Sequence, residues 1–179
     1  HKSHHYGMML SGAFPSYLDS YPLHDFSMYG AVPLTEIKQR LLAYRDAGTL
    51  DKVKMLLLTN CTFDGVVYNV EKIMEECLAI KPDLIFLWDE AWFAFAAFTP
   101  TFRQRTAMAT AKKLAAKYRS ADYRALYEQQ TKSLAGNLAS ENNLLPDPDK
   151  VRIRVYATQS THKSLTSLRQ GSMIQIFDQ

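Results

Sequence analysis

The sequence is poor in the residues that define several classes of protein. Only two of its 179 residues are cysteine, so a disulfide framework is not expected and a reducing, cytoplasmic location is favoured. Seven glycines and seven prolines exclude a collagen-like chain, and contents of 47% hydrophobic and 12% aromatic residues exclude an intrinsically disordered one. Basic side chains exceed acidic ones by only 21 to 18, which is too small an excess to indicate a nucleic-acid partner.

Long hydrophobic runs are also missing. The most apolar stretch, residues 84–98, is interrupted by Asp89 and Glu90 and is shorter than the ~20 residues of a membrane-spanning helix. We therefore expect no membrane association. The chain begins at His1 without an initiator methionine or a signal peptide, which indicates a piece of a longer protein.

Hydrophobic runs alternate with helical patterns along the chain. Strands are predicted at residues 13–18, 53–59, 84–88, 151–158 and 172–177, and helices at 34–47 and 70–80. Gly48 is expected to end the first helix, while Asn69 begins the second and Pro82 ends it. Strand 53–59 is a nearly continuous aliphatic run, typical of a strand covered on both faces. This order predicts a three-layer α/β domain, with a mainly parallel sheet and helices on both faces.

A region of different composition precedes strand 151–158. Residues 101–138 are rich in Ala, Lys, Arg and Tyr and predict two polar-faced helices that break near Ser120, before a loop at 142–149. Stretch 103–132 holds eight basic and two acidic side chains, so it could form a basic face for an acidic partner or nucleic acid. The sequence has no recognisable nucleic-acid motif, which favours the alternative of a solvated helix surface.

Polar residues follow three of the predicted strands. They are residues 60–65 (NCTFDG), 89–92 (DEAW) and 159–164 (QSTHKS). Because the carboxyl ends of parallel strands share one edge, where α/β sheets bind ligands, we expect these residues to meet there. The edge would combine carboxylates, hydroxyls, an imidazole and an amine, although residues 60–65 could equally form a plain turn.

Lys163 and Asp89 are the residues at this edge with the clearest chemical potential. A partly desolvated Lys163 could form a Schiff base with an aldehyde, and the preceding Ser160, Thr161 and His162 could bind a phosphate. The alternative is a solvated loop lysine. Asp89 needs a cationic or hydrogen-bonding partner at the mouth of a buried strand. That partner could be a ligand cation such as a protonated pyridine nitrogen, or Asp89 could be a helix cap or part of a structural salt bridge.

The other candidate ligands are less specific. His1, His4 and His5 form an H-x-x-H-H pattern, but no Asp, Glu or Cys follows at ligand spacing, so no metal site is predicted. Cys61 and Cys77 are expected to be reduced thiols in the core.

Four ordered motifs resemble the bacterial ornithine/lysine/arginine decarboxylases, pyridoxal-phosphate enzymes of the aspartate-aminotransferase fold (fold type I). Residues 157–165 and 170–174 (ATQSTHKSL and QGSMI) are similar to TQSTHKLL and QASMI of that family. Residues 59–65 with 68–69 resemble TNSTYDG and YN, residues 89–92 resemble DSAW, and residues 1–3 resemble the end of NCHKS. The resemblance covers most of the chain outside about 95–148.

The resemblance implies a catalytic role for three residues. Lys163 would bond covalently to the aldehyde of pyridoxal 5′-phosphate. Asp89 would bond the pyridine nitrogen and keep it protonated, and His1 would stack on the ring. The reaction implied for the full-length parent is decarboxylation of ornithine, lysine or arginine. Aminotransferase or aldolase-type chemistry on the same fold is an alternative, and a non-catalytic binding module using the basic face at 103–132 is another.

The resemblance also implies the surroundings of the cofactor. Ser160 and His162 would help to hold the phosphate, while Ala91 and Trp92 would border the ring. The sequence departs from the family pattern at Glu90, where serine is commoner, which places a possible second charge beside Asp89.

The implied domain organisation is incomplete. Residues 1–179 would form part of the cofactor-binding large domain, with a helical insertion at about 99–148. The phosphate-binding loop would lie upstream and the small domain downstream, so this piece alone would be inactive. The resemblance further implies a homodimer or higher homo-oligomer for the parent, a small amino-acid substrate and no nucleic-acid partner.

Overall fold

The centre of the structure is a four-stranded sheet. The computed structural model describes residues 1–134 and 144–179. Its strands lie in the order β3 (Met55–Thr59), β4 (Ile85–Asp89), β5 (Arg154–Ser160) and β6 (Ser172–Asp178). The β3–β4 and β4–β5 pairings are parallel and the β5–β6 pairing is antiparallel, so the sheet is mixed. The strands predicted at 53–59, 84–88, 151–158 and 172–177 are confirmed, and none of their ends moves by more than three residues.

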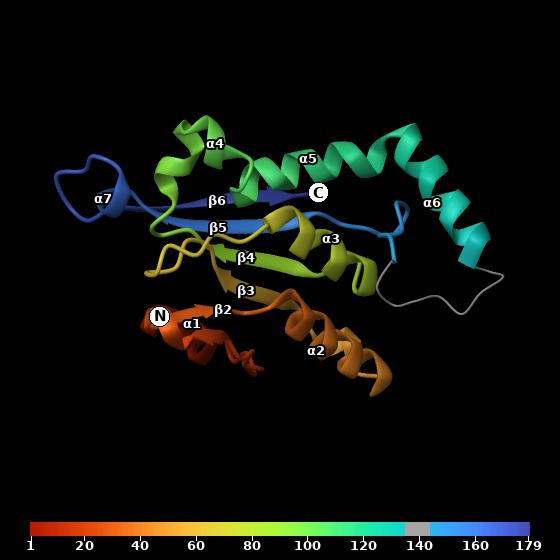
Figure 1. Ribbon diagram of the computed structural model, residues 1–179, viewed down its shortest axis with the longest axis horizontal. Coiled ribbons are helices and arrows are strands. Elements are labelled where there is room, and N and C mark those ends of the chain that lie inside the picture. Colours follow the sequence, from red (N-terminus) through yellow and green to blue (C-terminus); the bar gives the residue numbers. More distant parts are fainter. Residues whose placement is uncertain (135–143) are drawn as a thin grey trace.

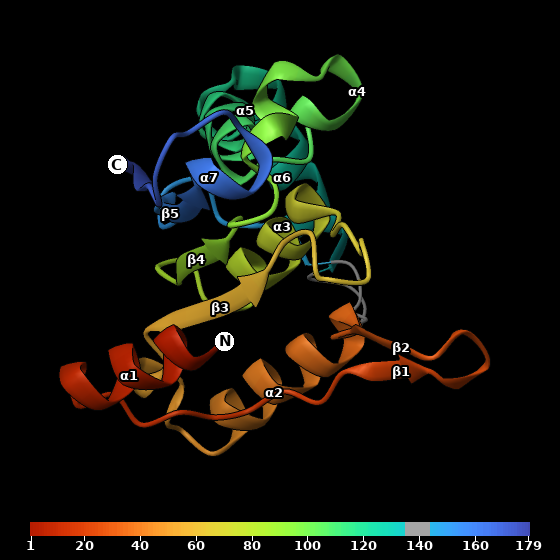
Figure 2. The same ribbon diagram turned by 90° about the vertical axis from the view of Figure 1, so that its left-hand side faces the viewer.

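Helices cover one face of this sheet. Figures 1 and 2 show α3 (Val70–Ile80) and α5 (Ala107–Arg119) on the same side of the strands. The alternate residues Phe86, Trp88 and Val155 are at most 1% exposed and pack with these helices in one core. Helix α2 (Leu34–Asp46) joins the same core through Ile37 and Leu41. Burial of each large side chain contributes about 1.5–3 kcal/mol of stability.

The opposite face of the sheet is largely open in the described part of the chain. Met55, Ile174 and Ile176 point to this face and are 47%, 56% and 60% exposed. The start of α1 (Lys2–Ser11) reaches this face through the contact of His4 with Asp89, and coverage of the rest of the face by helices stays a prediction. The helices that connect β3, β4 and β5 lie on the other face, because right-handed crossovers between strands that follow each other in one direction place them on the same side.

The expected burial of strand 53–59 on both faces is wrong for the same reason. In the described residues β3 is an edge strand, and Leu58 is its only buried residue. Its continuous aliphatic sequence resembles that of a central strand, although only one of its faces meets the core.

The N-terminal segment contains a helix and a hairpin. Helix α1 (Lys2–Ser11) is followed by β1 (Tyr21–Leu23), the 3-10 turn η1 (His24–Phe26) and β2 (Met28–Ala31), which pairs antiparallel with β1. The strand predicted at 13–18 is wrong, because these residues have no regular structure and Phe14 is 99% exposed. Gly30 adopts φ +73°, and a Cβ there would lie 1.8 Å from the Tyr21 carbonyl oxygen, so the hairpin requires glycine.

The predicted helix ends agree with the structure. Asn69 Oδ1 accepts a hydrogen bond of 3.2 Å from the Lys72 N–H at the start of α3. The predicted break near Ser120 separates α5 from α6 (Ala121–Leu134), and Ser120 Oγ accepts from the Tyr123 N–H.

The short elements η2 (Leu50–Lys52), η3 (Ala94–Phe98) and α4 (Pro100–Arg103) complete the described structure. The parts of the predicted second helix and loop at 135–143 lie outside the described residues.

Both cysteines are free thiols, but only one lies in the core. Cys77 is fully buried on α3, and burial raises its pKa to about 12. Cys61 is half-buried, so the prediction of two core thiols holds for Cys77 alone.

Three of the eight basic side chains in the stretch 103–132 form ion pairs within the chain. Lys113 lies 2.7 Å from Glu71, and Lys117 pairs with Glu75, so α5 is bound to α3. Arg124 on α6 pairs with Asp149 at 2.9 Å. The interpretation as a helix surface therefore describes this stretch better than the interpretation as a docking face. Among the described residues, no helix is both long and apolar enough to cross a membrane.

Candidate functional site

Three parallel strands end together at one edge of the sheet, as predicted. Thr59, Asp89 and Thr158 are in register across β3, β4 and β5. Beyond this register, the Asn60 N–H donates to the Asp89 carbonyl at 2.9 Å and the Glu90 N–H donates to the Thr158 carbonyl at 2.8 Å. Figure 2 faces this edge, where α1 begins and where α7 (Thr161–Ser164) follows β5.

Asp89 is the carboxylate that occupies the centre of this edge. Its Oδ2 lies 2.9 Å from Nε2 of His4, and its Oδ1 accepts a hydrogen bond of 3.0 Å from the Ala91 N–H. The hydroxyl of Thr158 lies 3.5 Å from the same Oδ1. Asp89 belongs to the open face of the sheet, so the start of α1 lies over that face.

The pKa of Asp89 is lowered from its ordinary value. Burial is the largest influence and acts to raise this pKa, but hydrogen bonds from His4 and from the Ala91 N–H act in the opposite direction. The positive charges of His4 and Lys163 lower it further. Asp89 is therefore a fixed anion at neutral pH, as required of a group that pairs with a ligand cation.

Lys163 is brought to the same edge by α7. It is half-buried, and its Nζ lies 5.3 Å from the centre of the Trp92 ring, a cation–π contact. Trp92 is 39% exposed and packs edge-on against Phe63, with 5.8 Å between ring centres. The side chain of Lys163 thus lies beside the Trp92 ring and within electrostatic range of Asp89.

The residues predicted to hold a phosphate lie around α7. Ser160 ends β5 and is the residue from which α7 starts. Nδ1 of His162 lies 3.0 Å from the carbonyl oxygen and 3.2 Å from the amide nitrogen of Gly171. A Cβ on Gly171 would lie 2.4 Å from the Thr161 hydroxyl, so a larger residue here would displace that side chain. Backbone contacts therefore fix the orientation of the His162 ring.

The histidine that contacts Asp89 is His4, which the sequence analysis considered only as a metal ligand. His1 is exposed and caps α1, with its Nδ1 accepting from the Ser3 N–H at 3.3 Å. The ring of His1 lies edge-on to that of His4, with 6.1 Å between centres, and His5 bonds the Tyr17 hydroxyl at 3.2 Å. No sequence signal points to His4, because its contact depends on how α1 packs on the sheet.

In residues 1–134 and 144–179 no three or more His, Cys, Asp or Glu side chains are grouped to hold a metal.

Glu90 lies in the core and not at the exposed edge beside Asp89, although the charge of Asp89 still acts to raise its pKa. Successive residues of a strand point to opposite faces, and Glu90 therefore enters the core, where it is 0% exposed. Its Oε1 accepts from Asn60 Nδ2 at 3.1 Å and from the Ala107 N–H at 2.8 Å, and its Oε2 accepts from Gln159 Nε2 at 2.9 Å. Burial raises the pKa of Glu90, although these three donors act to lower it.

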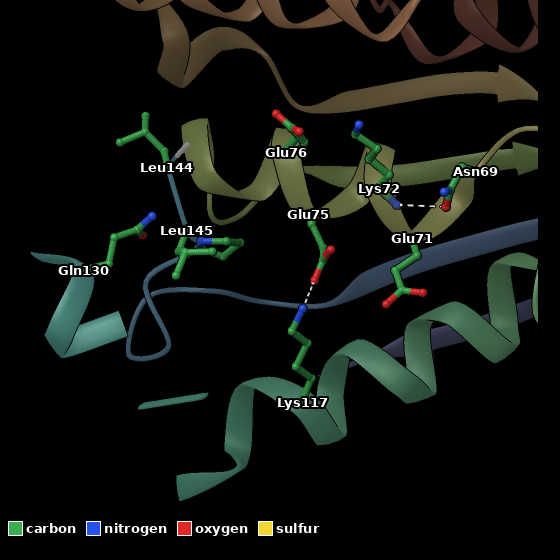
Figure 3. A pocket seen from close by; sticks show the side chains of 10 residues that line it. Asn69, Glu71, Lys72, Glu75, Glu76, Lys117, Gln130, Leu144 and Leu145 are labelled. Carbon is green, nitrogen blue, oxygen red and sulfur yellow. Dashed lines mark hydrogen bonds and ion pairs between the residues drawn. The ribbon is translucent and has the colours of Figure 1, made fainter. Parts of the chain in front are cut away.

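A cavity of about 480 Å³ lies elsewhere, next to α3, α5 and α6 (Figure 3). Its lining includes Glu75 and Lys117, which form an ion pair, and the apolar side chains of Leu144 and Leu145. None of the strand-end residues lines it. The chemically versatile groups are thus at the edge of the sheet and not in this cavity.

The structure therefore shows an α/β domain that places an anionic aspartate at the end of β4 and an amine in α7, just after the adjacent strand β5. Residues 1–120 match the family described as "Orn/Lys/Arg decarboxylase, major domain". The chain belongs to this family, as its motifs predict.

Similar curated proteins include lysine and arginine decarboxylases. A lysine decarboxylase of Pseudomonas aeruginosa is 29% identical over 99% of this chain and 19% of its own length. A biodegradative arginine decarboxylase of Escherichia coli is 28% identical over 98% of this chain and 19% of its own. A lysine decarboxylase of Hafnia alvei is 25% identical, with 98% and 18% covered. The chain spans about a fifth of the length of these relatives. No solved structure matches it significantly.

Proposed function

We propose that this chain is part of the pyridoxal-phosphate-binding large domain of a decarboxylase acting on ornithine, lysine or arginine. The observation that carries the proposal is the placement of Asp89 and Lys163 at the ends of adjacent strands, in a member of this family. The proposal includes a fold-type-I large domain, a helical insertion at about 99–148, and a homodimer or higher homo-oligomer in a longer parent.

The donor set at this edge fits pyridoxal 5′-phosphate. Asp89 is an anion that can hold a proton on the pyridine nitrogen, and His4 and the Ala91 N–H keep it charged and oriented. Lys163 provides the primary amine that an aldehyde requires. Ser160 and His162 supply donors for the phosphate at the start of α7, where Ala91 and Trp92 border the site. We propose that His1, next to His4, stacks on the ring.

Each residue has a defined task in the reaction. The cofactor, when bound, withdraws the electrons that remain on the substrate Cα after carbon dioxide leaves. Asp89 stabilises this withdrawal by keeping the positive charge on the pyridine nitrogen. Lys163 would hold the cofactor through its aldehyde and would supply the amine that frees the product at the end of the reaction. The walls of the site determine which bond at Cα stands perpendicular to the ring.

Product analysis of the full-length enzyme tests this function. Carbon dioxide and the corresponding amine are expected from ornithine, lysine or arginine, and Lys163→Ala should abolish their formation. Lys150→Ala changes an exposed lysine that pairs with Asp147 and serves as the matched control. A keto acid product would indicate transamination instead, and no turnover of any basic amino acid by an enzyme that binds the cofactor would contradict the proposal.

A further inference from the structure

Glu90 is a buried carboxylate that connects the elements of the candidate site. Its donors come from three different elements: Asn60 follows β3, Gln159 lies in β5, and Ala107 is the first residue of α5. Glu90 itself follows β4 directly. One side chain therefore connects the ends of all three parallel strands and the start of the helix that covers them.

The two side chains that donate to Glu90 are buried, and each forms further hydrogen bonds. Asn60 is 0% exposed, donates also to the Arg105 carbonyl at 3.1 Å, and accepts from the Tyr68 N–H at 3.1 Å. Gln159 is 3% exposed and accepts on its Oε1 from Gln175 Nε2 of β6 at 3.1 Å. The polar chain thus runs across the whole sheet, from Asn60 through Glu90 and Gln159 to Gln175.

A carboxylate at position 90 matches the donors of this hydrogen-bonded chain as they are oriented. All three partners are donors, and only a group that accepts on both oxygens satisfies them together. With Gln159 in its present orientation, a glutamine at position 90 would accept from Asn60 and Ala107 but would turn its own NH₂ toward the NH₂ of Gln159, and relief would require the amides of both Gln159 and Gln175 to turn over. A buried donor left without an acceptor weakens a structure by about 1–3 kcal/mol.

We propose that Glu90 is a positioning residue for the decarboxylase site. Through Asn60 and Gln159 it fixes Asp89 on β4 relative to β5 and so to Lys163, three residues beyond the end of that strand. The inference rests on the proposed function for the identity of the ligand, and on the hydrogen bonds above for the connection itself.

A charge-swapped pair provides the sharpest test. Glu90→Gln removes the carboxylate oxygen that accepts from Gln159. In the double variant Glu90→Gln with Gln159→Glu, the new carboxylate at position 159 accepts from the amide at position 90 and from Gln175. Every donor of the network then has an acceptor again. Glu128→Gln, an exposed glutamate on α6, is the matched control. The single variant should weaken pyridoxal 5′-phosphate binding about tenfold or more, at a temperature where circular dichroism shows it folded. The swapped variant should recover most of that loss, and Glu128→Gln should bind like the wild type.

Hydrogen exchange measures the connection without the cofactor. The N–H groups of Asn60 and Glu90 bond across the strand ends, and their exchange should accelerate about tenfold or more in Glu90→Gln and return in the swapped variant. The proposal would be overturned if Glu90→Gln kept the wild-type exchange rates and the wild-type affinity for pyridoxal 5′-phosphate. It would also be overturned if Glu90→Gln were less stable but bound the cofactor with unchanged affinity. If Glu90→Gln does not fold, the proposal requires the swapped variant to fold and to bind the cofactor like the wild type. A swapped variant that fails to do so would overturn the proposal. A full-length wild-type enzyme that binds no pyridoxal 5′-phosphate would instead contradict the proposed function, and the exchange rates would still decide whether Glu90 holds the strand ends.

Discussion

Nε2 of His4 lies 2.9 Å from Oδ2 of Asp89 and thereby joins the start of α1 to the end of β4. Because this contact lowers the pKa of Asp89, His4→Ala should raise that pKa toward or above its ordinary value. A ¹³C NMR titration of the Asp89 carboxyl carbon measures it. His5→Ala removes a neighbouring imidazole that bonds Tyr17 instead and should leave the titration unchanged. An Asp89 pKa that is the same in both variants and the wild type would exclude this role for His4.

The lowered pKa of Asp89 also predicts how stability depends on pH. A carboxyl group whose folded-state pKa is depressed stabilises the fold above its unfolded pKa, and this contribution is lost as pH falls through the folded-state value. The free energy of unfolding should therefore fall more steeply on acidification in the wild type than in Asp89→Asn. Urea unfolding at a series of acidic pH values tests this, and parallel curves for the two proteins would refute it.

The two faces of the sheet should respond differently to truncation. Phe86 is 1% exposed beneath the helices, so Phe86→Ala should lower the free energy of unfolding by about 3–5 kcal/mol. Ile174 is 56% exposed on the open face, and Ile174→Ala should lower it by less than about 1 kcal/mol. Chemical unfolding of this chain gives both values. Equal losses at the two positions would mean that the second face is covered.

The basic residues of α5 should contribute to stability through α3. Lys113→Glu and Lys117→Glu place like charges beside Glu71 and Glu75, and each should lower the free energy of unfolding by about 0.5–1 kcal/mol. Lys112→Glu, on an exposed neighbouring position, is the control. Thermal unfolding at low and high salt measures the effect, which should shrink as salt rises. A charge reversal that removes binding of an acidic partner without changing stability would favour the binding-module alternative instead.

The sequence predicted those parts of the molecule whose cause is local. The periodicity of residues 70–80 and the caps at Asn69 and Ser120 agree with the structure, because hydrogen bonds within a few residues determine them. The convergence of Asp89 and Lys163 was also predictable, since it follows from parallel strands ending at one edge. The open face of the sheet was not, because covering a strand depends on where its crossover helices lie and not on the strand's own hydrophobicity.

The contacts of the site side chains were harder to predict. Asp89 and Glu90 are adjacent carboxylates in the sequence, yet one faces the ligand edge and the other the core. The strand alternation that separates them could have been applied to residues 84–90, which would have placed Glu90 with Phe86 and Trp88. The choice of His4 over His1 as the partner of Asp89 has no such signal, because both lie at the start of one helix and only its packing selects between them.

Covalent trapping tests the central claim most directly. The enzyme that contains this sequence is loaded with pyridoxal 5′-phosphate, reduced with borohydride and digested, and the labelled peptide is identified by mass spectrometry. The account predicts a stable phosphopyridoxyl group on Lys163, and none on the corresponding peptide of Lys163→Ala. A label on another lysine in the wild type, with Lys163 unmodified, would contradict it.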